Sequence, residues 1–191
     1  MTKAEARLAA KTAVLKMSSD EKELARGAIC DALSGLQEFK SAHSVFVYLG
    51  TETEPATDEI VGLALMLERT VAVPRVRGKE MDAVVISPFT NFKTNKWNIL
   101  EPVGGHTIDD IDVAVIPLVA FDGLKRVGHG GGYYDRFLST HDCLKIGIAF
   151  DCQCVSNLQV ESFDIPLDVL VTEKRIINGD GETVNIYGET K

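Results

Sequence analysis

The sequence predicts an α/β fold: an open, mostly parallel sheet with helices on both faces, built as three layers in a single domain over residues 1–191. The chain has 191 residues, 45% of them hydrophobic, which is enough for one sizeable core. A strand, a helix and a second strand follow one another within about thirty residues, as in a βαβ unit. The run 112–117 is almost continuously apolar, as expected of a central strand covered on both faces.

Two helices are predicted before the first strand. The first spans residues 2–16, which contain neither Gly nor Pro, and we expect Leu8 and Leu15 to lie on one apolar face of it. The second begins at Ser18, because a glutamate three residues later gives the spacing of a capping box, and Gly35 ends it.

The rest of the chain alternates strands with helices and turns. β-branched and aromatic runs predict the strands, and Asn-Gly and Asp-Gly pairs predict a C-terminal hairpin within residues 176–184. Segments 88–102 and 118–132 are predicted to be loop-rich or irregular. Parallel pairing with right-handed crossovers makes the arrangement Rossmann-like. The predicted strands are 44–49, 71–74, 81–87, 112–117, 144–150 and 169–172, with helices at 57–68 and 133–139.

Charge and composition exclude several classes of function. The chain has 20 Lys and Arg against 28 Asp and Glu, a net charge of −8, so it lacks the basic surface of a general nucleic-acid or membrane-surface binder. No apolar run is long enough to span a bilayer, and the N-terminus lacks the apolar core of a signal peptide. We therefore expect a cytoplasmic protein without a nucleic-acid or membrane partner, and we predict a monomer or weak homodimer. The four cysteines have the spacing of neither a zinc site nor a disulfide framework. They are Cys30, Cys143, Cys152 and Cys154.

The most informative segment is a glycine-rich loop between a predicted buried strand and a short helix. Five of the 16 glycines lie within residues 123–132. Glycine allows a ligand to approach bare backbone N–H groups, and open α/β sheets bind ligands beyond the carboxyl ends of their strands. The loop is neither a Walker A motif nor Gly-x-Gly-x-x-Gly. A flexible surface turn is the alternative, but the Tyr-Tyr-Asp-Arg that follows at 133–136 is unlike a flexible linker.

Motifs spread along the chain match one known family in order. They are Lys3-x-x-x-Arg7; Glu54-x-x-Thr57; Trp97-x-Ile99-x-Glu101-Pro102; Phe121-Asp122-Gly123; Arg126-x-Gly128-x-Gly130-x-Gly132-Tyr133-Tyr134-Asp135; and Asp164-x-x-x-Asp168 with Thr172-Glu173. On these motifs the chain resembles the 5-formyltetrahydrofolate cyclo-ligase family, also called methenyltetrahydrofolate synthetases. His129 stands where the family most often has Tyr, and Val127 where it has Leu, so the shape of the folate side could differ.

The resemblance implies an enzyme that uses ATP and Mg²⁺ to close 5-formyltetrahydrofolate into 5,10-methenyltetrahydrofolate, with release of ADP and phosphate. It implies that the formyl oxygen is first phosphorylated, that N10 of the folate attacks the activated carbon, and that phosphate then leaves. Activation is needed because an amide-like formyl group is a poor electrophile with a very poor leaving oxygen.

The resemblance also assigns roles to individual residues. Arg126 and Tyr133 are expected to be catalytic, with Arg126 stabilising charge on the transferred phosphoryl group. Asp135 and Asp168 are expected to bind Mg²⁺, which prefers carboxylate oxygens. The expected ATP-binding residues are Lys3, Arg7, Arg126, Gly128, His129, Gly130, Gly131, Gly132, Tyr133 and Tyr134. The expected folate-binding residues are Leu49, Glu54, Trp97 and Tyr133, where a carboxylate can accept from pterin N–H groups and aromatic rings can stack on it.

Two alternatives stay open at this point. A catalytically silent folate- or nucleotide-binding module on the same fold would be expected to lack Lys3, Arg126 or Asp135, and all three are present. A sugar-phosphate isomerase or acyl-CoA transferase on a similar sheet would need a dedicated carboxylate base or nucleophile beside the loop, and no ATP.

Overall fold

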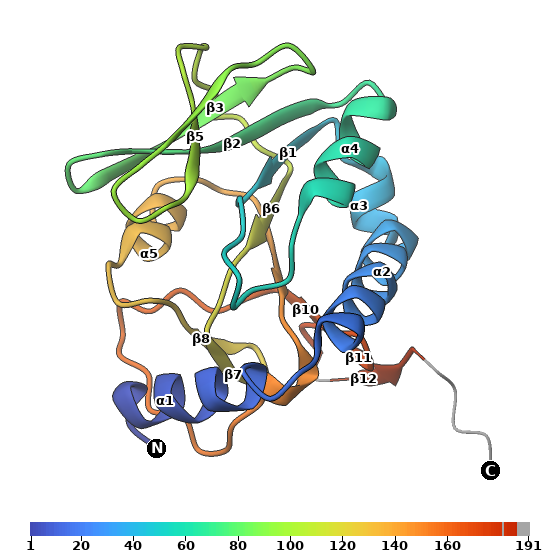
Figure 1. Ribbon diagram of the computed structural model, residues 1–191, viewed down its shortest axis with the longest axis vertical. Coiled ribbons are helices and arrows are strands. Elements are labelled where there is room, and N and C mark those ends of the chain that lie inside the picture. The colour runs from blue at the N-terminus through green and yellow to red at the C-terminus, as the bar shows by residue number, and fades with distance from the viewer. Residues whose placement is uncertain (181, 187–191) are drawn as a thin grey trace.

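A computed structural model describes residues 1–180 and 182–186. Within them, an eight-stranded sheet runs in the order β12-β11-β10-β9-β6-β1-β2-β3 (Figure 1). The neighbouring strands from β10 to β2 are parallel, whereas β3, β11 and β12 at the two edges pair antiparallel. The predicted mostly parallel sheet is therefore confirmed. The strands are β1 (Ser44–Val47), β2 (Thr70–Arg77), β3 (Glu80–Ile86), β6 (Val113–Ile116), β9 (Leu144–Ile148), β10 (Val169–Val171), β11 (Arg175–Ile177) and β12 (Thr183–Asn185).

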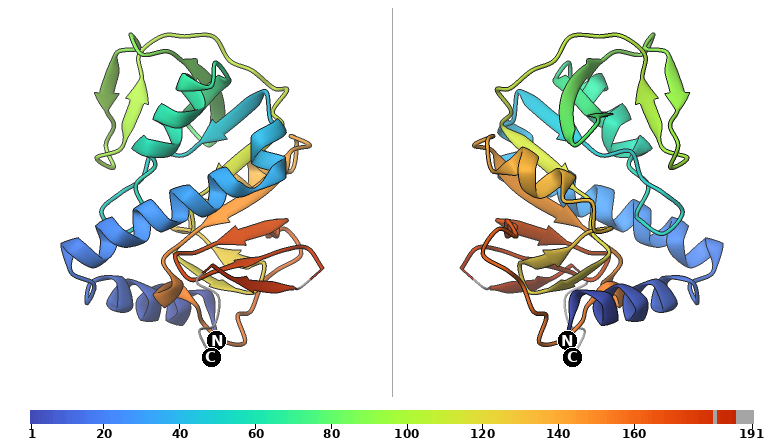
Figure 2. Two further views of the ribbon diagram at one scale, coloured as in Figure 1. Left: turned by 90° about the vertical axis from the view of Figure 1, so that its right-hand side faces the viewer. Right: turned by 90° about the vertical axis from the view of Figure 1, so that its left-hand side faces the viewer.

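Helices cover both faces of this sheet and complete three layers (Figure 2). Side chains alternate along β1, so that Val45 and Val47 pack toward Leu33 on one face while Phe46 points to the other. On that second face the ring of Phe137 stacks on Phe46, with centroids 4.7 Å apart. The first face is covered by α2 (Ser19–Gly35), α3 (Gln37–Ser41) and α4 (Asp58–Met66), and the second by α5 (Tyr133–Leu138).

The N-terminal helix α1 (Lys3–Val14) lies below the sheet in Figure 1, beside the hairpin of β7 (Ala120–Asp122) and β8 (Lys125–Val127). It buries Ala6, Ala10 and Val14. Leu8 and Leu15 are 72% and 73% exposed, so the expectation that they form the buried face is wrong. The helix lies close to the hairpin, and the face that makes this contact carries small side chains rather than leucines.

The helix starts are largely those that the sequence predicts. Ser18 caps α2: its hydroxyl accepts from the Glu21 amide at 3.2 Å, and the Glu21 carboxylate accepts from the Ser18 amide at 2.7 Å. Thr57 precedes α4, but its hydroxyl donates to the Tyr48 carbonyl at 2.6 Å and does not cap the helix. Thr57 instead fixes the loop after β1 to the end of that strand.

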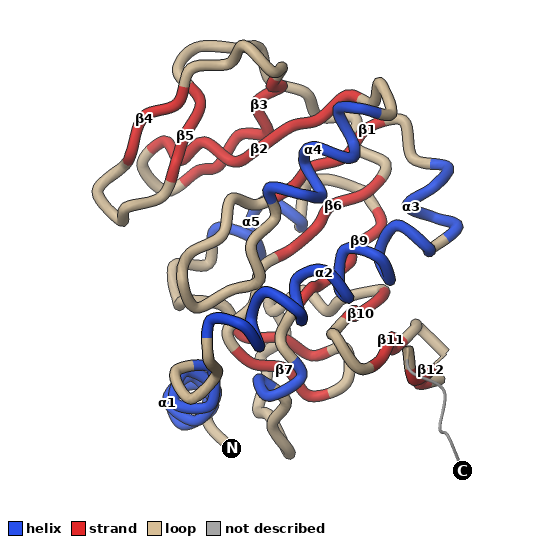
Figure 3. The backbone as a smooth tube through the Cα atoms, turned by 45° about the vertical axis from the view of Figure 1, so that its right-hand side comes forward, coloured by secondary structure: helices blue, strands red, loops and turns tan. Residues whose placement is uncertain are grey.

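Short hairpins occupy both segments predicted to be loop-rich. One is β7–β8, and the other is formed by β4 (Phe92–Thr94) and β5 (Leu100–Pro102), which Figure 3 shows beside β2. The predicted C-terminal hairpin is confirmed as β11–β12, although Gly181 of its turn lies outside the described residues. Among the residues described, none of the helices is long and apolar enough to cross a membrane.

Removing the Ser18 cap tests the capping box. We expect Ser18→Ala to lower the free energy of unfolding by about 1 kcal/mol, because the first turn of α2 loses a partner for an otherwise unpaired amide. The neighbouring Ser19→Ala, which removes no capping bond, should stay within about 0.5 kcal/mol of wild type. Urea denaturation midpoints measure both, and an equal loss for the two variants would show that the box adds nothing.

Candidate active site

A cavity of about 900 Å³ opens beyond the carboxyl ends of β1 and β6. Tyr48 and Leu49 follow β1 and line it, as does Pro117, which follows β6. The chain continues from β1 toward β2 on one side and from β6 toward β9 on the other. The cavity therefore lies at the switch point of the sheet, where neighbouring connections diverge and leave a crevice for a ligand. Every residue predicted to bind ATP or folate lines this cavity, and so does Asp135.

The glycine loop, residues 128–132, joins β8 to α5 along one wall of the cavity. Gly130 and Gly132 have φ of +102° and +65°, in the left-handed region that favours glycine. A Cβ at Gly132 would lie 2.7 Å from a guanidinium nitrogen of Arg136. Within the described chain, none of the backbone N–H groups of residues 128–135 has a protein acceptor. The loop thus offers a run of unpaired donors of the kind that binds phosphate.

Arg126 places a fixed positive charge beside this loop. The residue is only 4% exposed, and its guanidinium donates to Asp135 Oδ1 at 2.7 Å. The same oxygen accepts from the Ile165 amide at 3.1 Å, whereas Nε of Arg126 is buried without a partner. Burial lowers the pKa of the Arg126 guanidinium and the charge of Asp135 opposes that shift. Because arginine titrates so far above neutrality, the charge persists and is already oriented before a ligand arrives.

Lys3 and Arg7 lie one turn apart on α1 and both face the cavity, as the spacing predicts. Arg7 Nε donates to the Gly128 carbonyl at 2.7 Å and so anchors the start of the glycine loop. Lys3 Nζ lies 2.7 Å from carboxylate oxygens of Glu161 and Asp164. Burial lowers the pKa of Lys3, but the hydrogen bonds that Lys3 donates to these two carboxylates, together with their charges, outweigh it and the net shift is upward.

The opposite wall has the character expected of a site for a flat polar ring. Glu54 is 7% exposed, and one of its oxygens accepts from the amide and hydroxyl of Thr51. Its other oxygen lies 2.9 Å from His129 Nε2. Burial and then the charge of Glu54 raise the pKa of the Tyr134 hydroxyl well above its usual range. Trp97 meets the ring of Tyr133 edge-on, with centroids 5.9 Å apart.

The two aspartates predicted to share a metal are not brought together. Asp168 does not line the cavity; its carboxylate accepts from the Lys145 amide at 2.8 Å and pairs with Lys145 Nζ at 2.8 Å. In this structure the Asp168 carboxylate thus contacts β9 and lies apart from Asp135, so its predicted role as a metal ligand stays a prediction. Asp164, four residues earlier in the same motif, is the aspartate that reaches the cavity. Asp164 is part of a family motif in the sequence, but no role is predicted for it there.

Of the two aspartates predicted to bind Mg²⁺, Asp135 is the one that lines the cavity. Both hydrogen bonds to its carboxylate fall on Oδ1, which leaves Oδ2 for a ligand. In the part of the chain that the structure describes, no three His, Cys, Asp or Glu converge into a metal site. Mg²⁺ usually takes only one or two carboxylates, with phosphates and water completing its shell.

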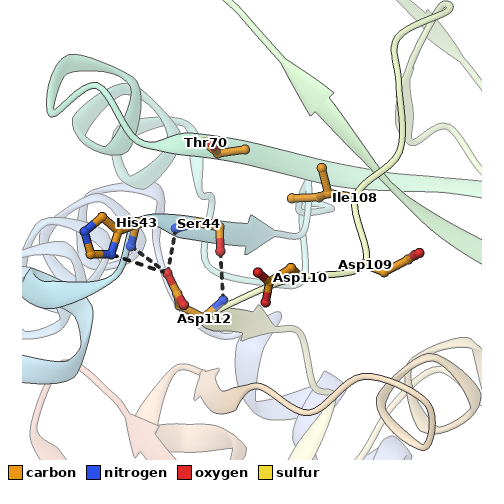
Figure 4. Close-up of a pocket in the computed structure, with 7 residues that line it drawn as sticks. All are labelled: His43, Ser44, Thr70, Ile108, Asp109, Asp110 and Asp112. Atoms are coloured by element: carbon orange, nitrogen blue, oxygen red, sulfur yellow. Dashed lines mark hydrogen bonds and ion pairs between the residues drawn. The ribbon is translucent and has the colours of Figure 1, made fainter.

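A second cavity, of about 520 Å³, lies at the opposite, amino-terminal edge of the parallel strands (Figure 4). It is lined by His43, Ser44, Thr70, Ile108, Asp109, Asp110 and Asp112. The Asp112 carboxylate accepts from the Ser44 amide at 2.9 Å and the His43 amide at 2.7 Å. The hydrogen bond from the Ser44 amide lowers the pKa of Asp112 most, and the bond from the His43 amide lowers it further. The carboxylate is thus engaged in joining the starts of β1 and β6.

The larger cavity defines a class of site, that of an α/β enzyme with two kinds of ligand. Its unpaired loop amides can bind a polyanion, and its carboxylate and aromatic side chains can bind a flat ring beside it. The chain belongs to the 5-formyltetrahydrofolate cyclo-ligase family, whose model matches residues 1–173. The resemblance seen in the motifs is confirmed, and the chain is an enzyme of this family. This membership favours a cyclo-ligase over the isomerase or transferase alternative.

Individual relatives agree over most of the chain. A probable 5-formyltetrahydrofolate cyclo-ligase of Caenorhabditis elegans is 31% identical over 202 residues, covering 95% of this chain and 94% of that protein. The 5-formyltetrahydrofolate cyclo-ligase of Escherichia coli K12 is 32% identical over 146 residues, covering 71% and 80%. The solution structure of Aquifex aeolicus 5,10-methenyltetrahydrofolate synthetase superposes with a TM-score of 0.83 at 31% identity, covering 99% of each chain.

Paired substitutions of the two aspartates test the metal assignment. We expect Asp135→Asn, whose amide oxygen can still accept from Arg126, to raise the Mg²⁺ concentration for half-maximal activity on the order of tenfold. Asp168→Asn should leave that concentration unchanged and lower the free energy of unfolding by about 1 kcal/mol or less. Mg²⁺ titrations of initial rate and urea denaturation separate the two; a raised Mg²⁺ requirement in Asp168→Asn would restore Asp168 as a ligand.

Proposed function

We propose that this chain converts 5-formyltetrahydrofolate to 5,10-methenyltetrahydrofolate in an ATP-dependent reaction that releases ADP and phosphate. The observation that carries the proposal is that one cavity at the switch point of the sheet contains both kinds of subsite. Unpaired loop amides with Lys3, Arg7 and Arg126 suit a triphosphate, and Glu54 with the Trp97 and Tyr133 rings suits a pterin. The names of the relatives support the same activity.

In the first step the formyl oxygen attacks the terminal phosphorus of ATP. A bond forms between that oxygen and phosphorus, the bond to the bridging oxygen breaks, and ADP leaves. Phosphoryl transfer needs alignment and neutralised charge more than a protein nucleophile. Arg126 and the amides of residues 128–132 supply fixed donors to the transferred group, and Arg7 holds the loop in place.

In the second step N10 attacks the formyl carbon, which has become electrophilic because its oxygen now leaves as phosphate. The new C–N bond closes the ring, the C–O bond breaks, and the N10 proton is released. Glu54 and the aromatic rings hold the pterin so that N10 and the formyl carbon stay in contact. Asp135 would hold Mg²⁺, which would neutralise phosphate charge, and Tyr133 lines the same cavity.

An absorbance assay tests the proposal directly. Purified protein is mixed with 5-formyltetrahydrofolate and Mg²⁺, with and without ATP, and formation of methenyltetrahydrofolate is followed. We expect product only with ATP and one ADP released per product formed. A protein that binds both ligands without turnover would be a catalytically silent module, and product without ATP would overturn the proposed chemistry.

Arg126→Lys tests the fixed guanidinium. Lysine retains the positive charge beside Asp135 but loses the planar fork of donors, so we expect kcat to fall at least about tenfold while the protein stays folded. Arg26→Lys is the matched control, because Arg26 lies in ion pairs on α2 and does not line the cavity. Steady-state kinetics and circular dichroism measure both; equal kcat values would remove Arg126 from the reaction.

Lys3→Ala tests the cation at the start of α1. We expect the KM for ATP to rise about tenfold with a smaller change in kcat, since one charged donor to the phosphates is lost. The control is Lys11→Ala, an exposed lysine two turns along the same helix and outside the cavity. An unchanged KM for ATP would mean that Lys3 serves only to hold Glu161 and Asp164.

A further inference from the structure

His129 lies in the glycine loop, yet its side chain reaches the folate half of the cavity. Its Nε2 is 2.9 Å from Glu54 Oε1, a carboxylate that comes from the loop after β1, 75 residues earlier in the chain. The side chain of Glu54 is 5% exposed and that of His129 is 47% exposed. The contact thus joins a buried carboxylate to a half-exposed ring, both of which line the cavity. The position of His129 in the glycine loop does not by itself suggest this contact with Glu54.

The hydrogen bonds of Glu54 define what it can still offer a ligand. A carboxylate has about four acceptor positions on its two oxygens. The amide and hydroxyl of Thr51 take two positions on Oε2, at 3.0 and 2.9 Å, and His129 takes one on Oε1. One position on Oε1 therefore stays open toward the cavity. His129 sets the rotation of the carboxylate and with it the direction of that open position.

The backbone of His129 belongs to the glycine loop, which is the part of the cavity proposed to bind the nucleotide. The Gly128 carbonyl accepts from Arg7 Nε at 2.7 Å, and the His129 N–H of the same peptide is one of the unpaired loop amides. A phosphate bound on these amides would restrict the loop at residue 129. Restricting the backbone there restricts the imidazole and hence Glu54, which is a contiguous physical connection between the two halves.

We propose that His129 is a positioning residue for folate, which orients Glu54 and couples folate binding to the occupancy of the glycine loop. The inference rests on the proposed function and assigns this side chain to the folate half of the site rather than to ATP. A ligand on the loop amides favours the conformation in which His129 holds Glu54. Folate and nucleotide therefore bind more tightly together than alone, each by the same factor.

The first test separates folate affinity from the intrinsic affinity for nucleotide. We expect His129→Ala to raise the KM for 5-formyltetrahydrofolate about three- to tenfold, the loss typical of one ordinary hydrogen bond, with the Kd for ADP and Mg²⁺ measured without folate nearly unchanged. His129→Gln, which can present an N–H at a similar distance, should recover most of the loss. His106→Ala is the control for removing an imidazole, because His106 is exposed and lies outside the cavity. A rise confined to the KM for ATP, or no rescue by glutamine, would overturn the proposal.

A double-substitution cycle tests whether His129 acts through Glu54. In a Glu54→Gln background the carboxylate is already gone, so we expect His129→Ala to change the KM for folate less than twofold further. Independent, multiplicative effects of the two substitutions would show that His129 works elsewhere and would contradict the inference.

Binding measurements separate this inference from the proposed function. The chain has one tryptophan, Trp97, and it lines the cavity, so its fluorescence can report bound folate without turnover. We expect ADP with Mg²⁺ to lower the Kd for 5-formyltetrahydrofolate in wild type, and this effect to be lost in His129→Ala. If wild type shows the coupling but makes no product, the proposed reaction fails and the coupling stands. Equal coupling in both proteins would overturn the role of His129 even if wild type is active.

Discussion

The architecture of the site depends on a buried charge, the guanidinium of Arg126. A charge so far from water is tolerated only where it is paired, and Asp135 supplies the pair at 2.7 Å. Arg126 lies on β8 and Asp135 on α5, so their contact fixes the separation that the glycine loop must span. Asp135 also accepts from the Ile165 amide, which holds the segment containing Asp164 near Lys3. One ion pair thus positions the loop, the helix after it and the N-terminal cation relative to one another.

The order of the strands explains why two such different ligands can meet. Between β1 and β6 the connections diverge, and the loops that leave these strands lie on opposite walls of the crevice. The loop after β1 carries Glu54, and the segment after β6 leads through the β7–β8 hairpin to the bare amides. Transfer of a phosphoryl group from nucleotide to folate needs both ligands at the same edge of the sheet, within reach of each other. The parallel arrangement meets this need because the carboxyl ends of β1 and β6 lie at the same edge.

Local patterns in the sequence predicted local structure well and long-range contacts poorly. The capping box at Ser18 and the apolar run 112–117 encode structure within a few residues, and both are confirmed. Apolar character alone gave the wrong face for Leu8, because a helix face is buried only where another element packs on it. The β7–β8 hairpin packs on a different face of α1, and the sequence of α1 does not reveal that contact. The position of Asp168 could not be predicted for a similar reason: its carboxylate pairs with Lys145 on the neighbouring strand, which is distant in the sequence. The residues of the family motifs line most of the cavity, yet no motif reports that His129 contacts Glu54.

The two edges of the sheet show what distinguishes a binding site from a structural contact. At the amino-terminal edge, Asp112 satisfies the amides of His43 and Ser44, so its charge and their donors stabilise the fold. At the carboxyl edge, the amides of residues 128–135 have no such partner in the described chain, although a charged carboxylate, Glu54, lies nearby. Two hydrogen bonds from Thr51 and one from the His129 ring engage that carboxylate. A bound anion can accept from several of these cavity-lining amides at once, and such binding would stabilise the folded protein.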